Sequence, residues 1–196
     1  TGTPLSGYTM SDSVLLTQLI SLMSMKAYIE WPTMLFTDIK GKEFYDKIGL
    51  TKFYDEVDVD FLTMYDHDYK FDRSSFYTSA KTAILTMQEP PFFFLDADLF
   101  ITQPMPVKFL KNDLVFAHPE ICRKEYLCEI KDFEGMGYEV PIAFDDTIMM
   151  PNTALMYMNN EELQTMYRDA HLNVILHKYK KEIPKWLWLY SDQGCL

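Results

Sequence analysis

The sequence predicts an α/β protein whose helices flank an open mixed sheet, and three observations lead to this prediction. Helix-like and strand-like segments alternate along the chain. An unbroken apolar run, Phe92 to Leu95, has the composition of a strand that is buried on both faces of such a sheet. No repeat, low-complexity tract or Gly/Ser-rich linker divides the 196 residues. We therefore expect one domain over residues 1–196.

The two ends of the chain resemble the inside of a domain rather than its tails. The sequence opens at Thr1 without a methionine or a signal-peptide pattern, and it closes on Asp192-Gln193-Gly194-Cys195-Leu196. We expect the domain to be truncated at both ends.

Caps, breakers and apolar spacing mark the elements of the first half. Ser11, Asp12 and Ser13 offer N-cap side chains for the first helix. Gly49 stands where a helix C-terminus favours a left-handed residue. The expected elements are a helix at 14–26, a buried strand at 34–36, a short helix at 42–48, an edge strand at 57–61 and a loop at 65–73.

In the second half, Pro90 and Pro91 end a helix whose apolar residues are expected on one stripe. The stripe consists of Phe76, Ala80, Ala83, Ile84 and Met87, and it leaves Ser79, Lys81 and Thr82 away from its centre. The expected elements are a helix at 75–87, strands at 92–95, 114–117 and 154–158, and a helix at 161–179.

Charge and composition exclude several classes of function. The formal net charge of −11 argues against a nucleic-acid partner, because phosphate backbones are bound by clustered Lys and Arg. No apolar run reaches the roughly 20 residues that cross a bilayer. A protein of this negative charge can bind a small anionic ligand only if a divalent cation neutralises the charge of the ligand. The three cysteines form no disulfide framework, which favours reduced thiols in a cytosolic protein.

The most informative stretch is a pair of aspartates directly after the apolar strand. Asp96 and Asp98 flank the small residue Ala97. Ligands of open α/β sheets bind outside the carboxyl ends of strands. In an extended backbone, residues i and i+2 point the same way and lie roughly 7 Å apart, so the two carboxylates could share a cation and its ligands. The alternative is a solvated turn, in which Asp is common.

Several short motifs in this order resemble the GT-A-fold glycosyltransferases with a DxD motif, and among them the bacterial polysaccharide-type enzymes. The motifs are Thr37-Asp38-x-x-Gly41, Ser79-Ala80-Lys81, the stretch from Phe92 to Ile101 with Asp96-Ala97-Asp98, Pro151-Asn152-Thr153-Ala154 and Ser191-Asp192-Gln193. The resemblance spans nearly the whole chain. It implies a GT-A-like, Rossmann-like open mixed sheet flanked by helices.

The resemblance also implies roles for particular residues. Asp98 would ligate Mn²⁺ or Mg²⁺, and Asp96 would contact the ribose or the metal. Lys81 would reach the donor sugar or diphosphate. Asn152 and Asp192, the candidate catalytic residues, would contact the donor sugar, the acceptor or a sugar hydroxyl.

The residues other than the two aspartates of the motif also have structural alternatives to a functional role. Lys81 could be a surface lysine, and Asn152 could form a turn before the next strand. Asp38, a candidate substrate-binding residue that could contact the nucleotide, could instead serve a turn. Asp192 lies near the end of the chain.

The predicted function is transfer of a sugar from a nucleoside-diphosphate sugar to a glycan or another hydroxyl acceptor. It belongs to polysaccharide biosynthesis in the cytoplasm, and a membrane-borne acceptor would bring the protein to the inner membrane as a peripheral protein. Two alternatives stay open: a non-catalytic carbohydrate- or nucleotide-binding domain, and a haloacid-dehalogenase-like phosphohydrolase. The second is disfavoured by Phe100, which stands where that family wants Thr or Val.

Overall fold

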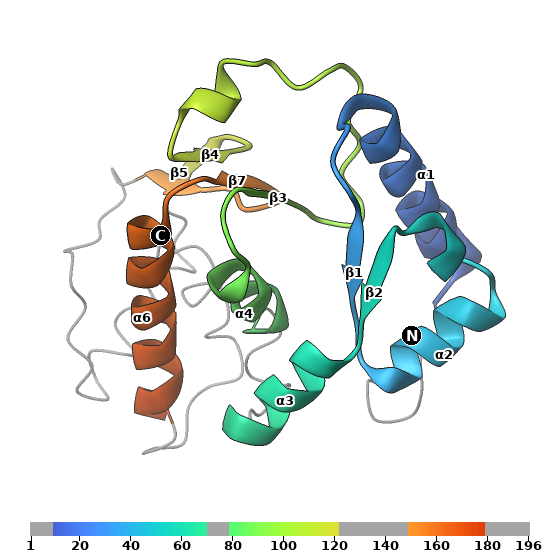
Figure 1. Ribbon diagram of the computed structural model, residues 1–196, viewed down its shortest axis with the longest axis horizontal. Coiled ribbons are helices and arrows are strands. Elements are labelled where there is room, and N and C mark those ends of the chain that lie inside the picture. Colours follow the sequence, from blue (N-terminus) through green and yellow to red (C-terminus); the bar gives the residue numbers. More distant parts are fainter. Residues whose placement is uncertain (1–9, 70–78, 122–148, 179–196) are drawn as a thin grey trace. The chain divides into compact units, whose positions relative to one another are not determined.

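A computed structural model describes residues 10–69, 79–121 and 149–178 of the chain (Figure 1). The chain forms two compact units. Unit 1 consists of Thr1–Lys70 and Asp96–Val107, and unit 2 consists of Phe71–Leu95 and Lys108–Leu196. The prediction of one domain over residues 1–196 stays a prediction.

Unit 1 begins with helix α1, Asp12–Tyr28. The Ser11 hydroxyl caps this helix by accepting a hydrogen bond from the Val14 backbone N–H at 3.4 Å. The predicted helix at 14–26 is thereby confirmed. Leu22 is buried, whereas Leu16, Ile20 and Met23 are exposed.

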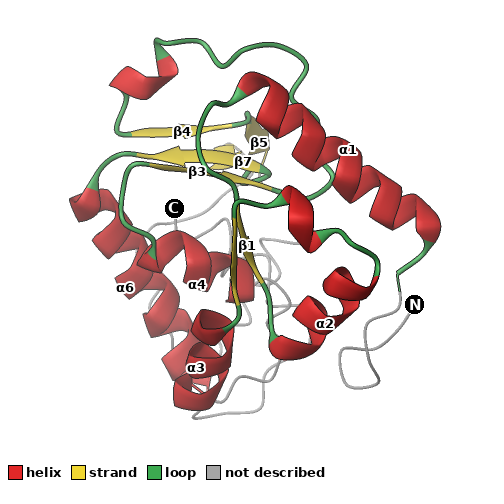
Figure 2. Ribbon diagram, turned by 45° about the vertical axis from the view of Figure 1, so that its right-hand side comes forward, coloured by secondary structure: helices red, strands yellow, loops and turns green. Residues whose placement is uncertain are grey.

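Two short parallel strands form the sheet of unit 1. Strand β1, Met34–Phe36, pairs with β2, Glu56–Asp58, and the backbone N–H of Thr37 extends the ladder to Asp58. In Figures 1 and 2, helices α1 and α2 lie on the same side of this pair. Helix α2, Ile39–Lys47, connects the strands and is followed by Gly49 at φ +74°, as predicted. The short 3-10 helix η1, Thr51–Phe53, then leads to β2.

The structure corrects the prediction for the segment after β2. The predicted strand at 57–61 ends at Asp58, because the Asp58 carboxylate accepts hydrogen bonds from the backbone N–H groups of Asp60 and Phe61 and starts a helix. This helix, α3, is Asp60–Tyr69. The loop prediction is therefore wrong for residues 65–69, and residues 70–73 lie outside the described part.

Unit 2 contains two antiparallel sheets. Strand β7, Leu155–Met158, lies between β3, Phe92–Leu95, and β4, Leu114–Phe116. These are the strands predicted at 92–95, 114–117 and 154–158. A second pair, β5 at Pro119–Ile121 and β6 at Met149–Pro151, was not predicted. Between β3 and β4 lies the short 3-10 helix η2, Phe109–Lys111.

The core of unit 2 lies between the three-stranded sheet and two helices. Helix α4 is Ser79–Met87 and helix α6 is Glu161–Lys178, and both lie on one side of the sheet (Figures 1 and 2). The core cluster is formed by Leu85, Met156, Met158 and Tyr167, with Phe92, Phe94 and Leu114 packed against it. The Gln164 side chain of α6 donates to the Leu85 backbone oxygen at 3.0 Å, which joins the helices.

The predicted apolar stripe of α4 is only partly right. Ala83 is buried, but Ala80 and Met87 are exposed, and Thr82 and Leu85 are buried instead. Small and apolar residues occur all around this short helix, so their spacing does not decide which side faces the sheet.

The chain is therefore a mixed α/β protein, as predicted. Its described strands form three small sheets, and β3 is half-buried rather than buried on both faces. No helix within the described ranges is long and apolar enough to cross a membrane.

The first prediction concerns Asp55, which links two parts of unit 1. Its carboxylate contacts the Lys26 ammonium at 2.8 Å and accepts hydrogen bonds from the backbone N–H and hydroxyl of Thr33. These donors, Lys26 foremost, hold the pKa of the Asp55 carboxyl well below its usual range. The associated stability is present above the unfolded pKa of about 3.9 and is lost as pH falls below it. Asp55→Asn should therefore lower Tm at pH 7 and reduce the fall in Tm between pH 7 and pH 3. Thermal denaturation at both pH values tests this, and an unchanged fall would contradict it.

The second prediction uses the corrected face of α4. Leu85→Ala should lower the free energy of unfolding by about 2–5 kcal/mol, because it leaves a cavity at a fully buried position. Met87→Ala, at a 50% exposed position of the same helix, should change it by no more than about 0.5 kcal/mol. Urea denaturation measures both. An equal loss for the two variants would show that the burial is assigned wrongly.

Candidate functional site

The two aspartates of the predicted site lie in a turn directly after β3. The Leu99 backbone N–H donates to the Asp96 carbonyl oxygen at 3.0 Å, which closes a four-residue turn with Ala97 and Asp98 in its centre. Asp96 is half-buried and Asp98 is exposed. The expectation of an extended backbone is therefore wrong, because strand pairing stops at Leu95. A turn is also what the solvated-turn interpretation predicts, so the backbone alone does not decide between the two.

The acidic turn is defined as Asp96–Leu99, and two serines of α1 hold its last residue and the chain directly after it. The Ser21 hydroxyl donates to the Leu99 carbonyl oxygen at 2.6 Å, and Ser21 is 2% exposed. The Ser24 hydroxyl accepts from the Ile101 backbone N–H at 3.0 Å and donates to the Ser21 carbonyl oxygen at 2.7 Å. The segment from Leu99 to Ile101 is thus fixed at both ends to one helix.

Sequence reasoning missed these serines, although a signal was present. Hydroxyl side chains at Ser13, Thr17, Ser21 and Ser24 recur every three or four residues, which places them along one line of α1. The spacing of the apolar residues, from which the helix was predicted, does not reveal this line of hydroxyl side chains. The last two members of the line bind the last residue of the acidic turn and the segment directly after it, whereas Thr17 donates within the helix to the Ser13 carbonyl oxygen.

Asp38 caps helix α2. Its carboxylate accepts a hydrogen bond from the Gly41 backbone N–H at 2.7 Å. This contact accounts for the Thr37-Asp38-x-x-Gly41 spacing, because an N-cap side chain binds the N–H three residues on. Asp38 thus caps a helix, where a turn was the predicted alternative, and its role in substrate binding stays a prediction.

Lys81 lies on α4 and is half-buried, so it is not an ordinary surface lysine. Its Nζ donates to the Thr153 hydroxyl at 2.9 Å and lies 5.3 Å from the centroid of the Phe94 ring. Thr153 is 1% exposed. The contacts place the ammonium against β3 and the residues that lead into β7.

Asn152 forms a turn before β7, as its structural alternative predicted. Its side-chain oxygen accepts from the Ala154 backbone N–H at 3.0 Å, and its Nδ2 donates to Glu120 Oε1 at 2.8 Å. The same Glu120 oxygen lies 3.4 Å from Nε2 of His118, whose side chain is 60% exposed. Sequence reasoning missed Glu120, because the strands β5 and β6 that bring it to Asn152 are far apart in the sequence.

The structure divides the predicted residues between the two units. In unit 2, Lys81 contacts the hydroxyl of Thr153, which follows Asn152 in the chain. Asp38, Asp96 and Asp98 belong to unit 1. Asp192 lies outside the described residues. Within the described part of the chain, no three His, Cys, Asp or Glu side chains gather as a metal-binding group.

Comparison with known proteins decides the family. The sequence pattern of one family matches residues 5–187 of the 196. The chain belongs to DUF6734, a family of unknown function. No curated protein and no solved structure matches the chain. The acidic turn, the two serines of α1, Lys81 and Asn152 all lie within the part that matches DUF6734.

The third prediction tests how α1 holds the acidic turn. Ser24→Ala removes the acceptor of the Ile101 N–H, so this amide should exchange with solvent faster, and the free energy of unfolding should fall by about 1 kcal/mol. Amide hydrogen exchange followed by NMR reports Ile101 directly. Thr17→Ala is the matched control, because its hydroxyl bonds only within α1. Equal protection of Ile101 in all three proteins would contradict the contact.

Proposed function

We propose that this chain is a metal-dependent glycosyltransferase with a GT-A-like fold. It moves a sugar from a nucleoside-diphosphate sugar to the hydroxyl of a glycan or a similar acceptor. The reaction belongs to polysaccharide biosynthesis in the cytoplasm. If the acceptor is anchored in the inner membrane, the protein associates with that membrane as a peripheral protein.

The observation that carries the proposal is the acidic turn with its support. Asp98 presents an exposed carboxylate in a turn whose last residue, Leu99, is bonded by Ser21, and Ser24 bonds Ile101 two residues later. A turn that is merely solvated does not require hydrogen bonds from a buried serine hydroxyl to its backbone. A carboxylate that binds a ligand benefits from a fixed backbone, because less freedom is lost on binding.

We propose that a divalent cation binds at this pair of carboxylates. Mg²⁺ keeps several waters and is commonly bound by one or two carboxylates together with substrate phosphates. Asp98, with Asp96 two residues before it, offers such an oxygen set, and the diphosphate of the donor would complete it. When bound, the cation would stabilise the negative charge of the departing diphosphate. It would also offset the repulsion between this ligand and a protein of net charge −11.

The other predicted residues keep their proposed roles. Lys81, whose ammonium contacts the Thr153 hydroxyl and the face of the Phe94 ring, is proposed to bind the donor diphosphate or sugar. Asn152, whose amide contacts Glu120 and the Ala154 backbone N–H, is proposed to contact the donor sugar or the acceptor. Asp96 contacts the ribose or the metal, Asp192 a hydroxyl of the acceptor or sugar, and Asp38 the nucleotide.

The fourth prediction tests the metal and donor site. Asp98→Asn keeps the shape of the side chain but removes the charge, so Mn²⁺-dependent affinity for UDP or GDP should fall more than about tenfold. Calorimetry with each nucleotide, with and without Mn²⁺, measures the change. Asp113→Asn, at an exposed aspartate before β4, is the matched control and should bind as the wild type does. Unchanged Mn²⁺-dependent affinity in Asp98→Asn would refute the role of Asp98.

Two outcomes of the same experiments would favour the alternatives. Nucleotide binding without turnover of any sugar donor would indicate a non-catalytic binding domain. Metal-dependent hydrolysis of an aryl phosphate would indicate a phosphohydrolase of the haloacid-dehalogenase type, in which an Asp after a strand acts directly on phosphate.

A further inference from the structure

The outer face of helix α1 in unit 1 is apolar. Leu16, Ile20 and Met23 are each between 47% and 57% exposed. On the opposite side of the helix, Ser21 and Leu22 are buried. The outer face of a surface helix is normally polar. Helix α2 of the same unit follows that rule, because four of its exposed residues are charged: Lys40, Glu43, Asp46 and Lys47. The outer face of α1 therefore departs from the pattern of a helix that faces water.

The exposed residues of this face have the spacing of a seam between two helices. Four of them follow one another at intervals of four, three and four residues, as the a and d positions of a heptad do: Leu16, Ile20, Met23 and Ala27. Ser13 extends the same line toward the N-terminus of the helix, and all five residues are exposed. These five residues are called the α1 seam. Residues with this spacing pack against a second helix that has the same spacing.

The charged residues beside the α1 seam favour an antiparallel partner. Asp12 and Lys26 both occupy position g of the heptad, which flanks the seam on one side. In a parallel pair, position g of one helix faces position e of the other, and the e positions hold Thr17 and Ser24. In an antiparallel pair, position g faces position g. Asp12 of each copy then lies opposite Lys26 of the other, so that opposite charges meet at both ends of the seam.

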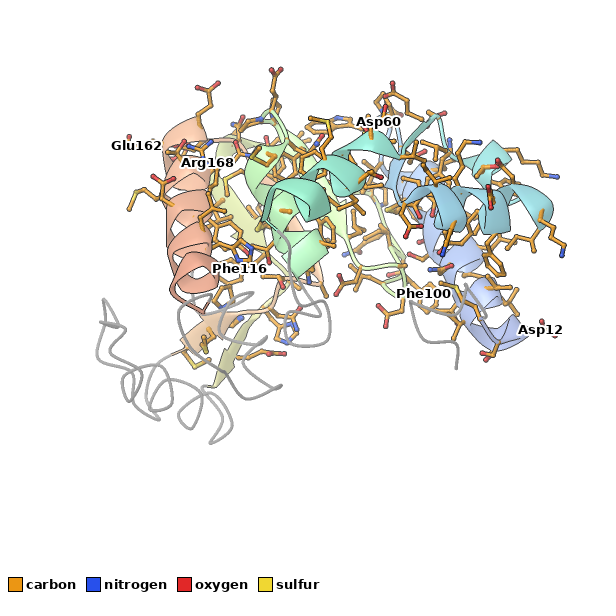
Figure 3. All side chains as sticks on the ribbon, turned by 90° about the horizontal axis from the view of Figure 1, so that it is seen from below. Asp12, Asp60, Phe100, Phe116, Glu162 and Arg168 are labelled. Atoms are coloured by element: carbon orange, nitrogen blue, oxygen red, sulfur yellow. The ribbon has the colours of Figure 1, made fainter. Side chains whose placement is uncertain are left out.

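The structure leaves both charged groups able to make this contact. Asp12 is exposed in the first turn of α1 (Figure 3). The Lys26 ammonium donates to the two carboxylate oxygens of Asp55 at 3.0 and 2.8 Å. An ammonium carries three N–H donors, so Lys26 can bind Asp55 and a second carboxylate at the same time. Asp55 also holds the ammonium in place, which reduces the freedom that is lost on association.

A membrane surface matches this face less well than a second copy does. Helices that lie on membranes carry Lys and Arg along the polar side of the apolar stripe. Lys26 is the one basic residue in the sequence of α1. The formal net charge of −11 would add repulsion from anionic lipids. A second copy of α1, in contrast, supplies both an apolar seam and a charge of the opposite sign.

We propose that the chain forms a symmetric dimer in which the α1 helices of two copies pack antiparallel along the α1 seam. The charged pairs set the register. In that register, Leu16 of one copy packs against Ile20 of the other. Met23 packs against Ser13 in the same way, and the symmetry repeats each contact. The seam is smaller than a standard interface of about 800 Å² per partner, so the dimer dissociates on dilution. This inference does not depend on the proposed function.

The fifth prediction is a monomer–dimer equilibrium that one charge on the seam disrupts. Sedimentation equilibrium of the full chain, from about 10 to 500 µM, should show dimers at the higher concentrations. Ile20→Glu should raise the dimer Kd at least about tenfold, because it buries carboxylates in the centre of the seam. Ile39→Glu, at a comparably exposed apolar position of α2, is the matched control and should dimerise as the wild type does.

Two results of sedimentation would overturn the proposal. One is a wild-type chain that stays monomeric over the whole range, including one that instead binds phosphatidylglycerol vesicles and loses this binding in Ile20→Glu. The other is an equal effect of Ile20→Glu and Ile39→Glu on the dimer Kd.

Disulfide formation tests the direction of the two helices independently. The variants Ser13→Cys and Met23→Cys, each with the three native cysteines replaced by serine, are oxidised separately and as a mixture. An antiparallel pair brings the two different positions together, so a cross-linked dimer should form in the mixture and not in either variant alone. A parallel pair would cross-link each variant to itself. That result, or a mixture without the cross-link, would overturn the antiparallel arrangement.

Discussion

The antiparallel pairing of β3 with β7 is the constraint on which unit 2 depends. Leu95, the last residue of β3, pairs with Leu155, the first residue of β7. The residues that lead into β7 are therefore held at the carboxyl end of β3, where Lys81 reaches Thr153 across the Phe94 ring. Asp96, the first residue of the acidic turn, directly follows Leu95 in the chain. A change in this register by one residue would turn every side chain of the strand to the other face.

The polar residues fall into two kinds according to what their side chains do in the fold. Asp38 and Asn152 serve a helix cap and a turn, so removing either would disturb the backbone as well as any ligand. Asp98 is exposed, and in the described part its side chain supports no backbone group. Substitution of such an exposed residue changes the free energy of unfolding little, so this position best separates effects on function from effects on stability.

Local features of the fold could be predicted from the sequence, and long-range ones could not. Ser11 and Gly49 act on their own helix ends, so the cap and the left-handed residue were predictable. The apolar run at Phe92–Leu95 also predicted β3. The pairing of β5 with β6 joins Ile121 to Met149, and no local pattern specifies a partner so far away. For the same reason Glu120 could not be placed beside Asn152.

The candidate site shows the same division. The Asp96-Ala97-Asp98 motif indicated where chemistry belongs, but alternation in an extended strand was the wrong geometry, because strand pairing ends one residue earlier. The hydroxyl line of α1 was visible in the sequence, yet only the fold shows that Ser21 and Ser24 meet Leu99 and Ile101. Phe100, between these two anchored residues, is 45% exposed (Figure 3).

The central claim is that the acidic turn binds a divalent cation together with a nucleoside diphosphate. An anomalous-difference map at the manganese absorption edge, from crystals of the chain grown with Mn²⁺ and UDP, tests it most directly. The account predicts a manganese peak bonded to a carboxylate oxygen of Asp98 and to phosphate oxygens of UDP. A nucleotide bound elsewhere, or a manganese ion that leaves Asp98 in solvent, would contradict it.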